Sequence, residues 1–152
     1  MNPGKYVIFA LGPEQFGLPI DNVEQILKSS KITKIPKSSK DILGLFSLRG
    51  STMPIVDTSN ILGVPSEEKG YFLVVSIDGL RAALLVDQVH KIVDLTADQI
   101  RPTEDLAGAK LSSHCAETET GLVVLLTPEA CLPAKALKKL GESKPNKELV
   151  AA

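Results

Sequence analysis

The sequence predicts an all-β fold, either a barrel or a sandwich, built from about ten short strands. Three features of the 152-residue chain support this prediction. Short runs rich in valine, isoleucine, leucine and aromatic residues recur along it, and clusters of Gly, Pro, Asn and Asp separate them. The alternation of strands with long helices that is typical of parallel sheets is missing. Two small barrels packed together would fit a break near residues 64–70.

The first strands form a candidate hairpin. Lys5–Leu11 and Gln15–Pro19 are rich in strand-favouring residues and flank a Gly-Pro turn. Asp21 can cap a short helix that runs through Lys28. The segment Ile32–Ile35 alternates apolar and polar residues, as a half-buried strand does, and a proline ends it.

The stretch Leu43–Asp57 (LGLFSLRGSTMPIVD) predicts a second hairpin, with a tight turn at Gly50 and Ser51. Its one formal cation, Arg49, lies inside an apolar run. An unpaired buried charge is costly, so Arg49 needs either a carboxylate partner or an exposed functional role.

Arg49 therefore has two interpretations, which are compatible. In the first, its guanidinium pairs with a carboxylate, from Glu24 on the expected first helix or from Asp57 on the partner strand. In the second, Arg49 orders a docking groove or reaches a partner protein itself. Both interpretations stay open at this stage.

The second half of the chain follows a helical turn at Thr58–Leu62 and the polar loop Val64–Gly70. Tyr71–Ile77 and Leu80–Val86 are apolar runs that flank Asp-Gly, the strongest short hairpin signal. The remaining strand candidates are Val89–Leu95, Leu106–Leu111 and Gly121–Leu126. A turn region at 96–102 and a polar loop at 112–120 separate them.

The C-terminal segment begins with a helix signal. Thr127, Pro128 and Glu129 supply a cap, a proline at the first position and an acid in the first turn. The helix is expected to run to about Leu140. Residues 142–152 are then a flexible polar tail after a single domain at 1–141.

Composition excludes several classes of function. Aromatic residues make up only 4% of the chain, so a base-stacking surface for nucleic acid lacks its side chains. The net charge of −1 favours neither nucleic acid nor an anionic membrane. No run of about 18 apolar residues could insert into a bilayer, and a signal peptide is missing. These features predict a cytoplasmic protein with reduced thiols.

Cysteine and histidine residues offer little chemistry. The spacing of His114, Cys115 and Cys131 matches no standard zinc pattern, so neither a metal nor another cofactor is expected. His90 lies in a strand-like run and is expected to face solvent. A nucleophile motif such as Gly-x-Ser-x-Gly is missing. A hydrolase that uses one of these side chains is one hypothesis, but the sequence favours a binding module without catalytic residues.

Five lysines recur every three residues, with no acid between Glu24 and Asp41. They are Lys28, Lys31, Lys34, Lys37 and Lys40. This spacing matches neither a helix nor a strand, so the lysines form a cationic ribbon and not one face of an element. Such a ribbon either protects a strand edge from aggregation or docks an acidic partner.

Five segments together resemble the CheW-type coupling proteins of bacterial chemotaxis. They are YVIFALGPEQFGLPIDNVEQIL, ITKIP, GLFSLRGSTMPIVD, FLVVSIDGLRAALLVDQV and IVDLTADQIRP. They cover roughly residues 5–102 in the order and spacing of the family. The family's asparagine–leucine–arginine–glycine turn corresponds here to Ser47, Leu48, Arg49 and Gly50.

The resemblance implies two intertwined five-stranded β-barrels of SH3-like type, with a hydrophobic core between them, a few short helices and a C-terminal helix. It also implies a non-enzymatic adaptor without a cofactor. Such proteins couple the cytoplasmic tips of methyl-accepting chemoreceptors to the regulatory domain of the histidine kinase CheA. Other CheW-like proteins in rings are further partners, and the expected location is at membrane-bound receptor arrays.

Carried over by position, the resemblance also implies a receptor-docking groove. Its residues would be Val23 and Ile26 on the expected first helix, Gly44, Arg49, Tyr71 and Phe72. An apolar groove of this kind can accept a helical hairpin tip. The contact residues for the kinase remain unknown.

The chain departs from the family pattern at two positions. The family has a carboxylate just before the isoleucine of the first helix, but Gln25 stands there and the acid Glu24 lies one residue earlier. Ser47 replaces the usual asparagine. These departures leave open a paralogue that serves another chemosensory array, such as one controlling surface motility or gene expression.

Overall fold

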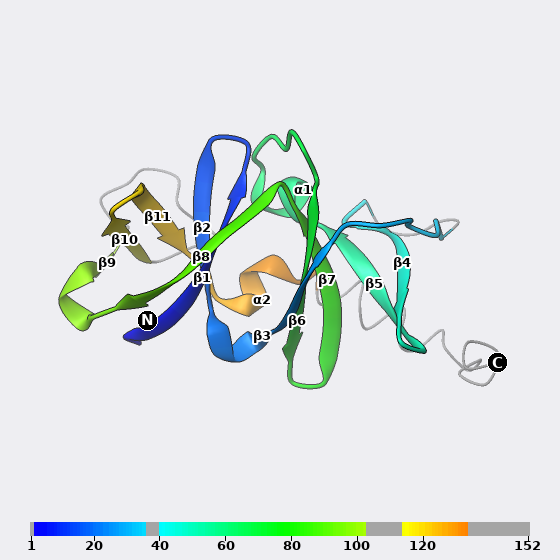
Figure 1. Cartoon of the computed structure of the whole chain (residues 1–152), viewed down its shortest axis with the longest axis horizontal. Helices are drawn as coiled ribbons and strands as arrows, with labels where there is room; N and C mark the ends of the chain where they lie inside the picture. The colour runs from blue at the N-terminus through cyan, green and yellow to red at the C-terminus, as the bar shows by residue number, and fades with distance from the viewer. Residues whose placement is uncertain (1, 36–39, 103–113, 134–152) are drawn as a thin grey trace.

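The computed structural model describes residues 2–35, 40–102 and 114–133. Within these ranges the chain forms two β-sheets (Figure 1). The six-stranded sheet has the order β8 (Gln88–Leu95), β1 (Gly4–Leu11), β2 (Glu14–Pro19), β11 (Gly121–Leu125), β10 (His114–Thr118) and β9 (Ile100–Pro102). The five-stranded sheet has the order β3 (Val23–Lys28), β6 (Tyr71–Ile77), β7 (Leu80–Val86), β5 (Ser51–Asp57) and β4 (Ile42–Leu48). The helical elements are η1 (Ile20–Asn22), α1 (Thr58–Leu62), η2 (Ala97–Gln99) and α2 (Pro128–Cys131).

The two sheets are intertwined because the chain crosses between them twice. It builds β1 and β2 in the six-stranded sheet, then all five strands of the other sheet, and returns with β8. Parallel pairing of β2 with β11 and of β5 with β7 joins segments that are distant in sequence. The predicted all-β architecture of two units is confirmed. The loop at 64–70 connects α1 to β6, and the strands on either side, β5 and β6, belong to the same sheet.

Three apolar clusters fill the molecule. The inter-sheet cluster draws on both sheets and includes Val7, Phe9, Leu11, Phe16, Leu18, Leu73, Val75 and Leu84. The five-strand cluster consists of Phe46, Met53, Ile55, Phe72, Val74, Ala83 and Leu85. The six-strand cluster consists of Tyr6, Ile8, Leu95, Ala116, Val123 and Leu125. Each sheet thus covers a core of its own, and the two sheets share a third core between them.

Strand β6 explains why several strands appear in the sequence as unbroken apolar runs. Successive side chains of a strand point to opposite faces of its sheet. Phe72 and Val74 enter the five-strand cluster, whereas Leu73 and Val75 enter the inter-sheet cluster. Both faces are buried, so neither carries the polar alternation of a half-exposed strand.

The two central hairpins have turns of the same type. Asp78 and Gly79 connect β6 to β7, as predicted, with φ values of 48° and 81°. The β4–β5 turn lies at Arg49 and Gly50, so the prediction of Gly50 and Ser51 is wrong by one residue. A two-residue type I′ turn favours glycine at its second position, and this preference sets the register.

The predicted helix at 21–28 is wrong. Ile20–Asn22 make a single 3₁₀ turn, and Val23–Lys28 form strand β3, which pairs with β6 along its whole length. A helix of eight residues is marginal by itself. Pairing with a buried strand satisfies the same backbone groups and lets the half-buried side chains of β3 cover the sheet.

The C-terminal part differs from the prediction in two places. The expected loop at 112–120 is wrong, because His114–Thr118 form β10 between β9 and β11. Helix α2 begins at Pro128 with Thr127 as its cap, as predicted, but it ends at Cys131. Leu132 is extended, which is the conformation favoured before a proline.

The remaining predicted segments differ from the structure or lie outside the described residues. The predicted strand at 32–35 is reduced to a single bridge between Thr33 and Leu45. The expected turn at 96–102 contains η2 and the short strand β9. The strand expected at 106–111, the helix expected beyond 133 and the tail at 142–152 lie outside the described residues.

Candidate functional site

Arg49 lies at the tip of the β4–β5 hairpin with an exposed side chain. Its φ of 51° and the φ of 80° at Gly50 place both residues in the left-handed region. For a residue with a Cβ this conformation costs about 1–2 kcal/mol. The hairpin therefore displays a cation at a backbone position that glycine or asparagine would occupy more easily.

Glu24 is not the partner of Arg49, so the first predicted pairing is wrong. Its carboxylate accepts hydrogen bonds from Arg81, at 3.2 Å from Nε to Oε2 and 2.9 Å from Nη2 to Oε1. A hydrogen bond with Ser76 and the contact with Arg81 hold the pKa of Glu24 below its ordinary value, against a smaller opposing effect of burial. The carboxylate that the sequence suggested as a partner for Arg49 therefore binds Arg81 on β7.

Asp57 is not the partner of Arg49 either. It caps helix α1, because its Oδ1 accepts hydrogen bonds from the Ser59 hydroxyl at 2.8 Å and from the Asn60 backbone N–H at 3.3 Å. Asp57 lies at the end of β5 opposite to the Arg49 turn. In the described part of the chain, no ion pair joins Arg49 to a carboxylate.

Val23 and Ile26 lie on strand β3 and not on a helix, yet they share one face. They pair with Val75 and Leu73, which are two residues apart on β6 and both belong to the inter-sheet cluster. A register shift between Val23 and Gln25 makes this possible. Val23 is half-buried, whereas the side chain of Ile26 is 41% exposed and available for contact.

The other three residues of the expected groove have different environments. Gly44 is buried, and a Cβ there would overlap the carbonyl oxygen of Thr33, so Gly44 serves the packing of the chain. Tyr71 is half-buried against the inter-sheet cluster. Phe72 is fully buried, with its ring centroid 4.8 Å from that of Phe46. Phe72 therefore belongs to the core of the five-stranded sheet, and its contact with a partner stays a prediction.

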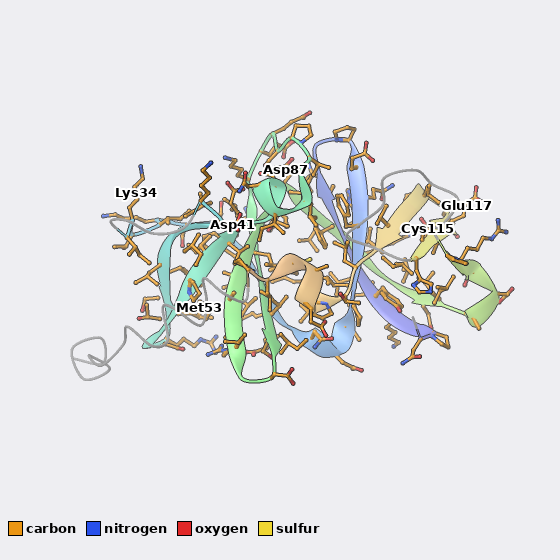
Figure 2. All side chains as sticks on the ribbon, turned by 180° about the vertical axis from the view of Figure 1, so that it is seen from behind. Lys34, Asp41, Met53, Asp87, Cys115 and Glu117 are labelled. Carbon is orange, nitrogen blue, oxygen red and sulfur yellow. The ribbon has the colours of Figure 1, made fainter. Side chains whose placement is uncertain are left out.

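Sequence reasoning missed Asp87, the most highly connected carboxylate among the described residues. It lies at the end of β7, where the loop at 64–70 and the β1–β2 turn meet (Figure 2). The carboxylate accepts five hydrogen bonds, one from a hydroxyl and four from backbone N–H groups. The donors are Ser66 Oγ at 2.6 Å, Gly12 N at 2.5 Å, Glu67 N at 2.8 Å, Glu68 N at 3.0 Å and Lys69 N at 2.8 Å.

These bonds determine the charge state of Asp87. Burial by itself raises its pKa, but the bonds from Ser66 and from the backbone outweigh burial and hold the pKa well below its ordinary value. One signal could have found this residue. In the dipeptide Val-Asp, Asp57 is the last residue of β5 and Asp87 directly follows β7. In each case the aspartate accepts a hydrogen bond from a backbone N–H of the segment that follows or faces it.

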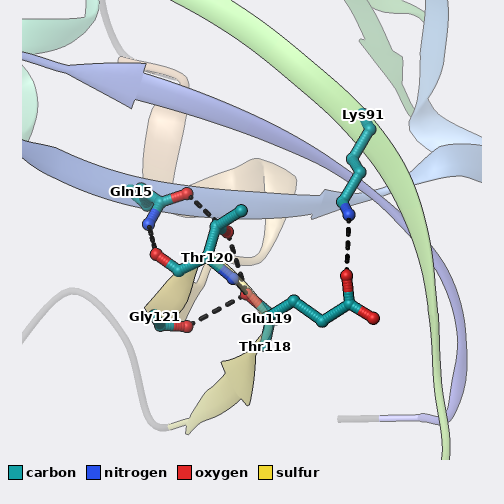
Figure 3. A network of polar contacts seen from close by, with 6 residues as sticks. All are labelled: Gln15, Lys91, Thr118, Glu119, Thr120 and Gly121. Carbon is teal, nitrogen blue, oxygen red and sulfur yellow. Dashed lines mark hydrogen bonds and ion pairs between the residues drawn. The ribbon is translucent and has the colours of Figure 1, made fainter.

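The six-stranded sheet carries a separate polar network (Figure 3). The side chain of Gln15 on β2 donates to the carbonyl of Thr120 at 2.8 Å, and its own oxygen accepts from the Thr120 hydroxyl. Lys91 on β8 lies 3.6 Å from Glu119. The network fastens the β10–β11 turn to two strands of its own sheet, away from Arg49.

The cysteines do not form a reactive site. Cys115 and Cys131 are both free and buried, and burial raises the pKa of Cys131 to about 12. A thiol of this kind is protonated at neutral pH and is a poor nucleophile. His90 is exposed, as predicted, and His114 is half-buried in β10. Among residues 2–35, 40–102 and 114–133, no group of three or more His, Cys, Asp or Glu side chains could hold a metal ion.

The lysine ribbon lies on the surface where it is described. Lys28, Lys31, Lys34 and Lys40 are exposed, and Lys37 lies outside the described residues (Figure 2 labels Lys34). Ser29 connects the ribbon to the loop at 64–70 by two hydrogen bonds. Its N–H donates to the carbonyl of Gly70, and its hydroxyl donates to the carbonyl of Lys69. Both interpretations of the ribbon remain compatible with this exposure.

In the described part of the chain, no helix has the length and apolar character needed to cross a membrane.

Comparison with known proteins identifies the family. Residues 5–136 match the model of the CheW-like domain. The chemotaxis protein CheW of Rhizobium meliloti is 33% identical over 110 residues, which are 70% of this chain and 71% of that protein. The CheW of Klebsiella aerogenes is 32% identical over 106 residues, which are 68% of this chain and 64% of that protein.

A solved structure agrees with the sequence matches. The crystal structure of scaffolding protein TtCheW from Thermoanaerobacter tengcongensis superimposes with a TM-score of 0.73 at 29% identity. The match covers 82% of this chain and 88% of that one. With the two-sheet fold and the exposed arginine hairpin, these matches show that the chain belongs to the CheW-like family, a family of scaffolds and not of enzymes.

Proposed function

We propose that this protein is a cytoplasmic adaptor that couples chemoreceptor tips to the regulatory domain of a CheA-type histidine kinase. Membership of the CheW-like family supports the role of a chemotaxis scaffold. The proposed coupling takes place at membrane-bound receptor arrays. Neither a cofactor nor a catalytic residue is needed for this function.

The observation that carries the proposal is the display of Arg49. The residue is exposed, has a left-handed backbone, and has no ion-pair partner in the described part of the chain. Residues held in sparsely populated conformations cluster at functional sites, because selection for stability alone removes them. An arginine fork presented in this way suits a carboxylate or carbonyl group on a partner.

Arg49 and Ile26 are the exposed residues of the proposed receptor-docking surface, and Val23 and Tyr71 are its half-buried residues. Gly44 contributes by allowing the close approach of Thr33 to β4. The combination of an apolar side chain and a cation fits a helical hairpin tip that carries both apolar and polar groups. The kinase would occupy a different surface, and other CheW-like proteins in rings would be further partners.

A second candidate function is that of a paralogue in an array that controls surface motility or gene expression. Its support is that one relative is not named a chemotaxis protein. Protein PilI of Pseudomonas aeruginosa is 30% identical over 103 residues, which are 63% of this chain and 58% of that protein. The genes next to this one would distinguish the two candidates.

The proposal is tested by titrating the purified protein against a chemoreceptor cytoplasmic fragment and against a CheA-type kinase, both from the same organism. Binding to both partners at micromolar concentration, about −8 kcal/mol, is expected for an adaptor. Binding to the kinase alone would indicate a paralogue. Absence of binding to either partner would reject the proposal.

The variant Arg49→Ala tests the docking surface. We expect binding to the receptor fragment to weaken by about tenfold, which is the loss of one charge-assisted contact. Binding to the kinase should be unchanged, and so should the melting temperature, because Arg49 makes no ion pair in the described part of the chain. Arg101→Ala, which removes an exposed arginine from the other sheet, is the matched control. Unfolding of Arg49→Ala would show that the residue is structural.

A further inference from the structure

Arg81 connects three strands of the five-stranded sheet. It lies near the start of β7, and its guanidinium donates to Glu24 on β3 and to Ser51 on β5. The bonds measure 3.2 Å and 2.9 Å to the Glu24 carboxylate and 3.0 Å from Nη1 to the Ser51 hydroxyl. Since β6 separates β3 from β7 in the sheet, this one side chain spans the width of four strands.

The two acceptors of Arg81 occupy special positions. Ser51 is the first residue of β5 and pairs with Leu48, so it closes the turn that displays Arg49. Glu24 is the residue at the register shift of β3, between Val23 and Gln25. Arg81 therefore ties the base of the Arg49 turn to the strand that carries Ile26.

The geometry of these bonds requires an arginine. Two nitrogens on one edge of the guanidinium hold both oxygens of Glu24, and the remaining terminal nitrogen is left for Ser51. Because the group is planar, fixing one edge on Glu24 also fixes the direction of the third bond. A lysine at this position would offer a point charge and could not make the same three bonds.

We propose that Arg81 is a positioning residue that holds the Arg49 turn in the geometry needed for docking. This inference rests on the proposed docking role of Arg49. The sequence suggested that Glu24 would restrain Arg49 directly. In the structure Glu24 restrains it indirectly, through Arg81 and Ser51, and leaves the guanidinium of Arg49 facing solvent.

The first arm of the test needs no partner protein. Hydrogen exchange of the backbone amides at 49–52 is compared between the parent protein and the variant Arg81→Ala. We expect exchange there to accelerate roughly fivefold, as the loss of an exposed ion pair with its hydrogen bonds allows, while exchange in β1 stays unchanged. Lys91→Ala breaks the exposed ion pair between Lys91 and Glu119 on the other sheet and is the matched control.

The second arm measures binding to the receptor fragment and to the kinase. Arg81→Ala should weaken receptor binding roughly fivefold and leave kinase binding unchanged, whereas a merely structural role would weaken both. Arg81→Lys should restore part of the affinity. In the double variant Arg49→Ala/Arg81→Ala, the loss should be no greater than in Arg49→Ala alone, because the two residues act through the same contact.

The two arms separate failure of this inference from failure of the proposed function. Unchanged exchange at 49–52 in Arg81→Ala would overturn the inference, whatever the binding data. Additive losses in the double variant would also overturn it, because Arg81 would then act independently of Arg49. If Arg49→Ala itself leaves receptor binding intact, the docking role of Arg49 fails, and with it the positioning role of Arg81.

Discussion

Asp87 holds three segments of the chain at one point. Its buried carboxylate accepts N–H groups from the β1–β2 turn and from successive residues of the loop at 64–70. The β1–β2 turn belongs to the six-stranded sheet, whereas Asp87 follows β7 of the five-stranded sheet. The carboxylate therefore also fixes how the two sheets meet. Lys69 has a left-handed φ of 49°, and the hydrogen bond from its N–H to the Asp87 carboxylate helps to hold that conformation. The aspartate thus holds by hydrogen bonds a polar loop that has few apolar side chains to pack against the core.

The variant Asp87→Asn tests this role. An asparagine keeps the size of the side chain but loses the charge and replaces an acceptor by an N–H₂ group that faces donors. We expect the free energy of unfolding at neutral pH to fall by about 2–4 kcal/mol, which urea titration would measure. Asp94→Asn changes an exposed aspartate on β8 and should shift stability by less than about 0.5 kcal/mol. Equal effects of the two variants would contradict the argument.

Asp87 also predicts how stability depends on pH. Its pKa in the folded protein lies below the unfolded value of about 3.9. The stabilisation is therefore complete above that unfolded value and is lost as the pH falls below it toward the folded pKa. Unfolding titrations at neutral pH and near pH 3 should show that the difference in stability between the parent protein and Asp87→Asn becomes smaller at the lower pH. A constant difference between them across this range would contradict the prediction.

At the scale of elements, the two type I′ hairpins show what local sequence can specify. Asp78-Gly79 was predictable because the residue pair itself favours the left-handed geometry. Arg49-Gly50 was placed one residue too late, since arginine gives no such signal. Val23–Lys28 was mispredicted because its strand conformation depends on β6, a partner distant in sequence. His114–Thr118 forms a hairpin with the adjacent strand β11, but its polar composition gave no strand signal. For the candidate site, the sequence suggested that Glu24 pairs with an arginine, but it did not reveal that this arginine is Arg81.

The variant Arg49→Asn separates the stability of the hairpin from its function. Asn-Gly is a preferred pair for a type I′ turn, whereas arginine is strained there. We expect the free energy of unfolding to rise by about 0.5 kcal/mol, while binding to the receptor fragment falls as in Arg49→Ala. Thermal unfolding and the binding titration measure the two effects. A variant that is both more stable and fully able to bind would refute the docking role.

At the scale of the whole molecule, the inter-sheet cluster makes the two sheets one unit. It takes Val7, Phe9 and Leu11 from β1 and Leu73, Val75 and Leu84 from β6 and β7. Neither sheet can bury this face alone, so separation would expose a large apolar surface. Two intertwined β units were predictable from the strand count and the resemblance. The strand order within each sheet was not, because the sequence does not reveal that β2 pairs with β11 and that one sheet has six strands.

Leu84→Ala tests whether the two sheets unfold together. Leu84 is fully buried in the inter-sheet cluster, so truncation should cost about 2–5 kcal/mol of the free energy of unfolding. If the cluster couples the sheets, native-state hydrogen exchange should show the opening free energies of protected amides in β1 and in β5 falling by the same amount. Leu122→Ala removes a leucine that is 53% exposed and should leave both unchanged. Faster exchange in β5 alone would mean that the two sheets are separate cooperative units and that the inter-sheet cluster does not couple their unfolding.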